Sequence, residues 1–311
     1  MPAEVVVVGE CMLELAARAD GSPDGWQLGF AGDTFNTTLY LARLQVPVAY
    51  LTALGCDPFS QDMRSAWARE GIDTSLVLTH ASRLPGLYAI RNDADGERHF
   101  HYWRERSAAR ALFTLPGIDA ALARAREAKW FYLSGITLAI FTPPERARLI
   151  ATAAAVRAAG GQVVFDPNYR RALWDDPQRA RDAFASLASH VSLALPTHAD
   201  EALLFEDTDP EQTAARWREA GAAEVVVKCG AQGCLVAAST GTARIAAATV
   251  TAVDTTGAGD AFNAAYLAGR IAGLPPATAA RGANRLAGEV IQHRGAILAP
   301  ERTVMLQALW T

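Results

Sequence analysis

Short apolar runs alternate with longer amphipathic stretches along most of the chain. Val5–Val8 is a β-branched apolar run that ends at a glycine, a pattern typical of a strand buried in a parallel sheet. The similar runs that we also predict as strands are Val48–Leu54, Trp130–Leu133, Val163–Phe165, Val191–Leu195 and Val225–Val227. The segments predicted as helices are Asp33–Leu44, with Asp33 as its N-cap, Pro58–Glu70, Pro144–Ala159 and Gln178–Ala188. This alternation predicts an α/β fold with a mostly parallel sheet.

One region breaks the alternation. Leu87–Arg91 and His99–Trp103 alternate around Asn92–Gly96, which contains an Asp-Gly turn signal, so we predict a β-hairpin. Together with Cys11–Ala16 and the segment near Leu28, the hairpin could build a small separate sheet. A sheet drawn from two places in the chain is expected to act as a lid on the larger domain. Lids that exclude water are common where a phosphate is transferred.

Composition narrows the class of protein and of partner. The chain has 311 residues, of which 50% are hydrophobic and 20% charged, so it is globular and neither disordered nor fibrous. The 29 Lys and Arg against 33 Asp and Glu give a net charge of −4, which argues against a nucleic-acid partner. The four cysteines form no Cys-x-x-Cys pair, and the chain shows neither a signal-peptide pattern nor an apolar run of membrane-spanning length. We therefore expect reduced thiols, no membrane partner and a cytoplasmic location.

The strongest chemical signal is Asp254-Thr255-Thr256-Gly257-Ala258-Gly259-Asp260, which lies between Val250–Val253, predicted as a strand or extended segment, and a helix over Ala261–Ile271. A glycine-rich turn that opens a helix directs several backbone N–H groups at one point, where the helix dipole also favours an anion such as a transferring phosphate. Asp260 lies in the first helical turn, where it could take a proton from an attacking hydroxyl or merely complement the helix N-terminus. No Gly-Lys-Ser/Thr ends the turn as in a P-loop, and Phe262 replaces the third glycine of a dinucleotide fingerprint.

Three motifs resemble those of the PfkB, or ribokinase-like, family of sugar kinases. They are the Asp254–Asp260 run, the Gly32-Asp33-Thr34-Phe35-Asn36 sequence that opens the first helix, and the strand and turn Lys228-Cys229-Gly230-Ala231-Gln232-Gly233. Their order and spacing fit the family over nearly the whole chain. The shorter motifs that resemble the 2-keto-3-deoxygluconate kinases of this family are Gly9–Leu15, Arg83–Tyr88, Gly96–Arg98, Tyr102–Arg104, Leu133–Ile136 and Asp166–Arg170.

The resemblance implies a single ribokinase-like kinase domain over residues 1–311, with a doubly wound, mostly parallel sheet flanked by helices and a discontinuous β lid from about 11–31 and 74–106. It implies ATP and magnesium as cofactors, Asp260 as the catalytic base, and an anion hole made by Gly257, Ala258 and Gly259. The further nucleotide-binding positions that it implies are Asn168, Thr197, Lys228, Gly230 and Gly233. The sugar contacts that it implies are Gly32, Asp33, Asn36, Tyr88, Tyr102, Arg104, Arg170 and Asp260.

Two positions depart from the family pattern. Many members carry Gly-Gly before the first helix, where this chain has Ala31-Gly32. The acidic magnesium motif of the family, Asn-x-x-Glu, reads Thr197-His198-Ala199-Asp200 here, with Glu201 next, so the metal ligands stay open. Several members use a monovalent cation near the position of Asp254, and lid sheets in the family often pair between subunits. The resemblance therefore allows a monovalent cation and a homo-oligomer here.

The residues themselves favour a sugar acid as the substrate. Tyr102 and Arg104 lie two apart on a predicted strand and project from one face, and Arg170 follows the strand Val163–Phe165, at the sheet end where ligands bind. A cation and a phenol on one face suit a ligand with hydroxyls and a carboxylate. Either arginine alone could instead be a solvated surface charge, and Arg170 could serve ATP.

The sequence therefore predicts ATP-dependent phosphorylation of 2-keto-3-deoxygluconate at its terminal hydroxyl, which gives the 6-phospho sugar acid. One alternative is a PfkB kinase for a neutral sugar such as fructose or ribose, which would leave Arg104 and Arg170 without a carboxylate. A second is a catalytically inactive sugar-acid sensor, against which the intact Asp260 argues. The failed dinucleotide fingerprint argues against a nicotinamide oxidoreductase.

Overall fold

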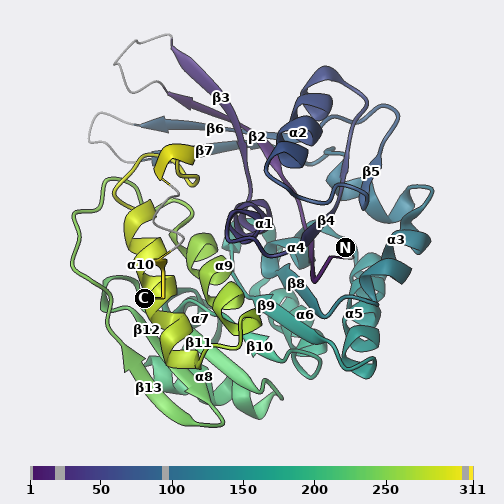
Figure 1. Cartoon of the computed structure of the whole chain (residues 1–311). Coiled ribbons are helices and arrows are strands. Elements are labelled where there is room, and N and C mark those ends of the chain that lie inside the picture. The colour runs from purple at the N-terminus through teal and green to yellow at the C-terminus, as the bar shows by residue number, and fades with distance from the viewer. Residues whose placement is uncertain (1–2, 18–24, 93–97, 303–307, 311) are drawn as a thin grey trace.

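The computed structural model describes residues 3–17, 25–92, 98–302 and 308–310, and a long sheet runs through the middle of the molecule (Figure 1). Its strands are β1 (Val5–Val8), β4 (Val48–Leu54), β5 (Val77–Thr79), β8 (Trp130–Ser134), β9 (Gln162–Asp166), β10 (Leu193–Ala194), β11 (Glu224–Lys228), β12 (Cys234–Ala238) and β13 (Gly241–Ile245). They lie in the order β13-β12-β11-β10-β9-β8-β1-β4-β5. Pairing is parallel from β5 to β11 and antiparallel at β12 and β13, so the predicted α/β fold with a mostly parallel sheet is confirmed.

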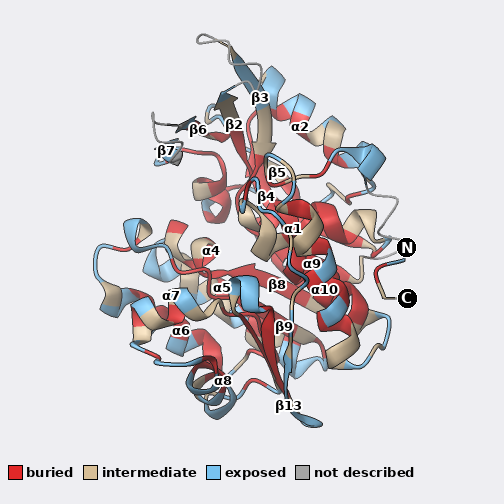
Figure 2. Ribbon diagram, turned by 90° about the vertical axis from the view of Figure 1, so that its left-hand side faces the viewer, coloured by how far each residue is buried: buried red, intermediate tan, exposed pale blue. Residues whose placement is uncertain are grey.

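Helices cover both faces of this sheet, because alternate side chains of its strands enter two separate cores. In β1, Val6 and Val8 belong to one core, and Val5 and Val7 belong to the other. The helices that pack into the first core are α3 (Ile118–Ala125), α4 (Gly135–Ile140), α5 (Pro143–Ala158), α6 (Pro177–Ala188), α7 (His198–Phe205) and α8 (Pro210–Glu219). Those that pack into the second are α1 (Asp33–Arg43), α2 (Pro58–Arg69), α9 (Ala258–Ile271) and α10 (Pro276–Val290). Figure 2 colours central strands such as β8 and β9 red, and the helices around them carry exposed residues in pale blue.

A second, smaller sheet projects from one end of the large one (Figure 1). It has the order β3-β2-β6-β7, with β2 (Met12–Ala17), β3 (Trp26–Ala31), β6 (Gly86–Asn92) and β7 (Arg98–Trp103). β2 pairs in parallel with β6, and the other two pairs are antiparallel. The predicted hairpin and the small sheet drawn from two places in the chain are therefore present. The predicted Asp-Gly turn falls on residues 93–97, which lie outside the described residues, and the function of the sheet as a lid stays a prediction.

Local signals fix where several helices begin. Asp57, Asp176 and Asp209 each cap a helix, because their side chains accept hydrogen bonds from backbone N–H groups of the first turn and a proline follows each of them. The predicted N-cap at Asp33 is wrong: Gly32 holds that position, and the Asp33 carboxylate is instead turned toward Asn168. Val250–Val253 forms no strand: it has no regular secondary structure and bends at Val253. No helix within the described ranges is both long and apolar enough to cross a membrane, and all four cysteines are free.

Gly135 brings two loops of the large sheet together. It is the first residue of α4 and follows Ser134, whose hydroxyl accepts a hydrogen bond from the Thr137 N–H. A Cβ atom at Gly135 would lie 1.9 Å from the carbonyl oxygen of Pro167, in the segment after β9. Only glycine permits this approach, which holds the start of α4 against the segment that carries Asn168.

The first prediction concerns this contact. Gly135→Ala should lower the free energy of unfolding by about 1–3 kcal/mol, because the backbone must shift to admit the methyl group. Gly288→Ala in α10 is the matched control, since nothing lies within 4 Å of its added Cβ, and alanine there should leave stability unchanged or raise it by about 0.5–1 kcal/mol. Urea unfolding of both variants measures the difference. Equal midpoints for the two variants would contradict the close approach at Gly135.

Candidate active site

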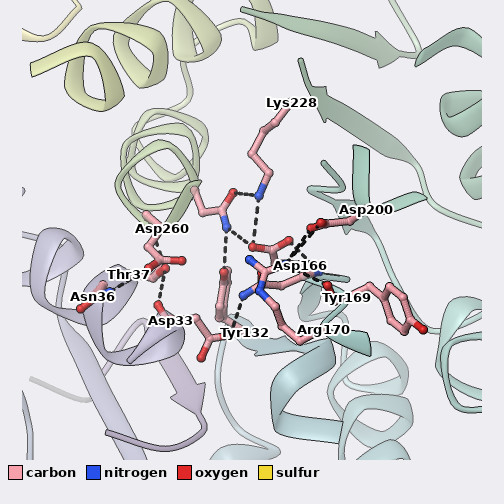
Figure 3. Close-up of polar contacts among 12 residues, drawn as sticks. Asp33, Asn36, Thr37, Tyr132, Asp166, Tyr169, Arg170, Asp200, Lys228 and Asp260 are labelled. Atoms are coloured by element: carbon pink, nitrogen blue, oxygen red, sulfur yellow. Dashed lines mark hydrogen bonds and ion pairs between the residues drawn. The ribbon is translucent and has the colours of Figure 1, made fainter. Parts of the chain in front are cut away.

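The candidate site lies where the parallel strands end. Asp166 is the last residue of β9 and Lys228 the last of β11, while Asp33 and Asp260 lie in the first turns of α1 and α9. Figure 3 shows these side chains directed toward one another. The carboxyl ends of parallel strands share one edge of a sheet, and helix N-termini meet there, so this edge is the usual ligand position in open α/β sheets. The structure thus brings together residues that are far apart in the sequence.

The glycine-rich turn before α9 has the conformation that an anion hole requires. Gly257 is the N-cap, with φ of 75°, and a Cβ there would lie 2.6 Å from the Cβ of Ala296, so both conformation and space demand glycine. The Asp254 carboxylate accepts hydrogen bonds from the N–H groups of Thr256 (2.9 Å) and Gly295 (2.5 Å), which ties the turn to the following loop. Within the described residues, the N–H groups of Gly259 and Asp260 donate to no protein acceptor. They are available to an anion at the positive end of the helix dipole.

Asp260 is held at this helix end by α1. Its Oδ2 accepts a hydrogen bond from Nδ2 of Asn36 at 2.8 Å, and the Thr37 hydroxyl donates to its backbone oxygen at 3.3 Å. Loss of hydration on burial and, to a smaller extent, the negative charge of Asp33 together raise the pKa of Asp260 to about 8. A carboxyl with such a pKa is a stronger base than an ordinary aspartate. This suits a group that accepts a proton from a hydroxyl.

A buried network surrounds Asp166 and Lys228. The Lys228 ammonium donates to Asp166 at 3.1 Å and to Oδ1 of Asn263 at 3.0 Å. Asn263 in turn donates to Asp166 at 2.7 Å and to the Tyr132 hydroxyl at 3.0 Å. Sequence reasoning did not single out Asp166, Asn263 or Tyr132 as site residues. The helical spacing could have found Asn263, because it lies three positions after Asp260 and therefore on the same face of α9.

Asn168 links the segment after β9 to α1. Its φ of 34° is in the left-handed region, which asparagine tolerates better than most residues, and its N–H donates to Oδ1 of Asp166 at 3.2 Å. Its side-chain Nδ2 donates to Oδ2 of Asp33 at 3.0 Å. Burial raises the pKa of Asp33, and the hydrogen bonds from Ser134 and Asn168 lower it in part. Asn168 thus donates hydrogen bonds to two carboxylates, those of Asp33 and Asp166.

Arg170 pairs with Asp200 at the same edge. Its Nη1 lies 3.2 Å from Oδ2 of Asp200, and the pair is half exposed on the arginine side. Glu201, the neighbouring acid, is directed away from the site, where it is fully buried and pairs with Arg216 and Trp217 of α8. Of the two acids that the sequence left open, only Asp200 therefore faces the site. Successive side chains of a helix point about 100° apart, which explains why Asp200 and Glu201 face different surroundings.

The small sheet adds two tyrosines and an arginine. The rings of Tyr88 and Tyr102 are 5.8 Å apart, and the Tyr88 hydroxyl is hydrogen bonded to the Glu14 carboxylate. Burial raises the pKa of Tyr102, while the positive charges of Arg104 and Arg170 lower it, so both cations act on this phenol. Arg104 follows β7 directly and is 5% exposed, so it is not a solvated surface charge.

The remaining predicted residues lie on the supporting backbone. Thr197 forms an isolated parallel bridge with Lys228, which places the start of α7 beside the end of β11. Gly230 and Gly233 have φ of 56° and 86° and shape the turn after β11. Gly32 lies so close to the loop after β1 that an added Cβ would be 2.3 Å from the Glu10 carbonyl oxygen. Their contacts with nucleotide or sugar stay predictions, as does the monovalent cation near Asp254.

An acid-lined edge with an open helix N-terminus, on a doubly wound sheet that carries a small second sheet, defines a ribokinase-like protein. The chain belongs to the pfkB family of carbohydrate kinases, whose sequence profile matches residues 2–303. It is 40% identical to the 2-dehydro-3-deoxygluconokinase of Dickeya dadantii (strain 3937), over 94% of this chain and 96% of the relative. The family resemblance of the motifs is therefore confirmed.

Solved structures agree with this assignment. The PfkB protein from Polaromonas sp. JS666 superposes with a TM-score of 0.83 at 30% identity and covers 97% of this chain and 99% of its own. A protein assigned as ribokinase II from E. coli, in complex with ATP and Mg²⁺, superposes with a TM-score of 0.85 at 25% identity, over 99% and 98% of the two chains. The predicted ribokinase-like fold is thus confirmed across nearly the whole chain.

The second prediction tests Asp260. Asp260→Asn keeps the size of the side chain but cannot accept a proton, so it should lower kcat for phosphate transfer by about 10²–10⁴ and leave the fold unchanged. Far-UV circular dichroism serves as the control for folding. A folded variant that retains more than half of the wild-type kcat would rule out Asp260 as the base.

The third prediction uses the pKa of the same group. Because the pKa of Asp260 is about 8 in the fold against 3.8 ordinarily, the folded carboxyl keeps its proton to a higher pH than the unfolded chain does. The folded state therefore loses stability as pH rises from about 4 to about 8, and Asp260→Asn removes that loss. Urea unfolding between about pH 6 and pH 9 should show the variant gaining stability relative to wild type. A difference that does not change with pH would contradict the raised pKa.

Proposed function

We propose that this enzyme transfers a phosphate from ATP to the terminal hydroxyl of 2-keto-3-deoxygluconate. The observation that carries the proposal is the position of Asp260, whose carboxylate lies beside the open N–H groups of α9 and within the same edge as Arg170. The near-full-length relative named 2-dehydro-3-deoxygluconokinase supports the choice of substrate. The neutral-sugar kinase and the inactive sensor are not favoured, because relatives named 2-dehydro-3-deoxygluconokinase are 38% and 40% identical to this chain, whereas a relative named fructokinase is 31% identical.

The residues around Asp260 supply the steps of the transfer. Asn36 holds the Asp260 carboxylate, which accepts the proton of the sugar hydroxyl while the hydroxyl oxygen forms its bond to the γ-phosphorus and ADP leaves. The N–H groups at the start of α9 stabilise the charge on the transferring phosphate. Lys228 adds a positive charge next to these groups, since its ammonium lies 3.7 Å from where a Cβ of Gly259 would be. We infer that the small sheet closes over the sugar and excludes water.

Two acids of the site offer ligands for a magnesium ion, while the described residues contain no group of three His, Cys, Asp or Glu side chains that could hold a metal. Asp166 and Asp200 offer carboxylate oxygens, the ligands that Mg²⁺ prefers; burial raises the pKa of Asp200 most, and the charge of Asp166 raises it further. Such crowding of like charges suits a site that receives a cation. Asp166 and Asp200 would hold the metal, which neutralises charge on the ATP phosphates when bound.

The cations of the site account for selection of a sugar acid. Arg170 comes from the segment after β9, Arg104 from the end of β7, and both act electrostatically on Tyr102. A carboxylate next to these guanidinium groups gains charge-assisted hydrogen bonds that a neutral sugar lacks. A coupled ADP-release assay over ketodeoxygluconate, gluconate, fructose and ribose tests the proposal. Preference for fructose or ribose would replace it with the neutral-sugar reading.

The fourth prediction isolates the substrate charge. Arg104→Met removes a charge-assisted hydrogen bond of about 1.5–3 kcal/mol, so kcat/KM for ketodeoxygluconate should fall roughly 10- to 150-fold while KM for ATP changes little. Turnover of fructose should suffer much less, because fructose has no carboxylate. Arg179→Met is the control for loss of a guanidinium, because Arg179 of α6 forms an exposed ion pair with Asp175. Equal losses for both sugars would show that Arg104 does not recognise the carboxylate.

A further inference from the structure

We infer that Glu10 is a positioning residue that fixes the orientation of Arg104 toward the carboxylate of the substrate. The inference rests on the proposed function, because it takes Arg104 to contact a sugar acid. Glu10 itself lies behind the arginine and does not contact the substrate in this arrangement. Its contribution is to leave one edge of the guanidinium directed at the site.

The two residues join the large sheet to the small one. Glu10 follows β1 through Gly9 and precedes β2, and Arg104 follows β7. The Glu10 side chain is 1% exposed and that of Arg104 is 6% exposed, so the ion pair is buried at the root of the small sheet. Oε2 of Glu10 accepts hydrogen bonds from Nε of Arg104 at 2.9 Å and from its Nη2.

This arrangement occupies only one edge of the guanidinium. Nε and Nη2 both face Glu10, and within the described residues Nη1 donates to no protein acceptor. A guanidinium is planar and rigid, so fixing one edge also fixes the direction of the other. The Arg104 Cζ atom lies 5.9 Å from the centre of the Tyr102 ring; burial raises the pKa of that phenol, and the positive charges of Arg104 and Arg170 lower it. The free edge is therefore held in place before any substrate arrives.

The pair is poorly explained by stability alone. Burial of two charges costs several kcal/mol per ion, and apolar residues of similar size are often at least as stabilising. Oε1 of Glu10 has no hydrogen-bond partner within the described structure, which adds to that cost. Gly86 keeps space for the pair, since its added Cβ would lie 2.9 Å from Oε1 of Glu10 and 3.2 Å from Cβ of Arg104. The backbone is thus arranged to admit a costly charge pair next to a substrate site.

A double-mutant cycle with ketodeoxygluconate tests the inference. Glu10→Gln, Arg104→Met and the double variant are compared by steady-state kinetics, with circular dichroism and thermal melting to verify folding. Glu10→Gln should raise KM for ketodeoxygluconate about 10-fold, with kcat and KM for ATP nearly unchanged, because only the aim of Arg104 is lost. The double variant should be no worse than Arg104→Met alone, because Glu10 acts through the arginine.

Glu201→Gln is the matched control. Glu201 is another buried glutamate in a pair with an arginine, but it faces α8 and not the site, so its variant should lower the melting temperature without changing either KM. Losses from Glu10→Gln and Arg104→Met that multiply in the double variant would overturn the inference, as would a Glu10→Gln variant that behaves like Glu201→Gln.

Two further results keep the inference testable. If Glu10→Gln does not fold, Glu10→Asp replaces it, because the shorter side chain withdraws the carboxylate from Arg104 without removing a charge; an unchanged KM for ketodeoxygluconate in that variant would contradict the positioning role. A wild type that does not phosphorylate ketodeoxygluconate would contradict both the proposed function and the inference. A wild type that phosphorylates ketodeoxygluconate, with losses from Glu10→Gln and Arg104→Met that multiply in the double variant, would contradict the inference alone.

Discussion

Burial of four carboxylates at one edge of the sheet is the constraint on which the candidate site depends. Asp33, Asp166, Asp200 and Asp260 converge there; loss of hydration is the largest cause of the raised pKa of Asp33, Asp200 and Asp260, and the negative charge of Asp166 adds to it at each of the three. The fold offsets this cost by giving each acid its own partner from a different element. Asp166 pairs with Lys228 and Asp200 with Arg170. Asp260 and Asp33 each accept a hydrogen bond from an asparagine amide. The sheet order and the helix N-termini bring these partners to one place.

Close backbone approaches make this crowding feasible. Gly257 lets the turn before α9 pack on Ala296, and Gly135 lets α4 touch the segment after β9. Gly257 opens the helix that carries Asp260, and Gly135 packs against the residue before Asn168, so both close approaches hold backbone that carries site residues. The same principle holds at the root of the small sheet, where Gly86 lies over the Glu10–Arg104 pair. A charged site in a protein interior needs both partners for its charges and a backbone close enough to hold them.

The periodicity of the sequence predicted most elements of the large sheet, because a buried parallel strand must be apolar on both faces and Val5–Val8 is so. The capping preference of aspartate gave a wrong prediction at Asp33. Its carboxylate instead contacts Asn168, more than a hundred residues later in the chain. Sequence reasoning also missed Asn263 and Tyr132, since neither belongs to a motif: Asn263 joins the site through Asp166 and Lys228, and Tyr132 joins it through Asn263. Asp260 and its glycines were predictable because their chemistry is local to a turn and the helix that follows it.

The sequence by itself determined the class of fold and the family, since these rest on the hydrophobic period and on motifs of residues adjacent in the chain. The tertiary structure alone decided which of Asp200 and Glu201 faces the site, because one helical step separates an acid at the sheet edge from one buried against α8. It alone decided that Arg104 is buried and paired with Glu10, since Glu10 lies in the loop between β1 and β2 and Arg104 follows β7, more than ninety residues later in the chain. Local spacing fixes the direction of a side chain relative to its own element, and only packing between elements fixes what that side chain meets.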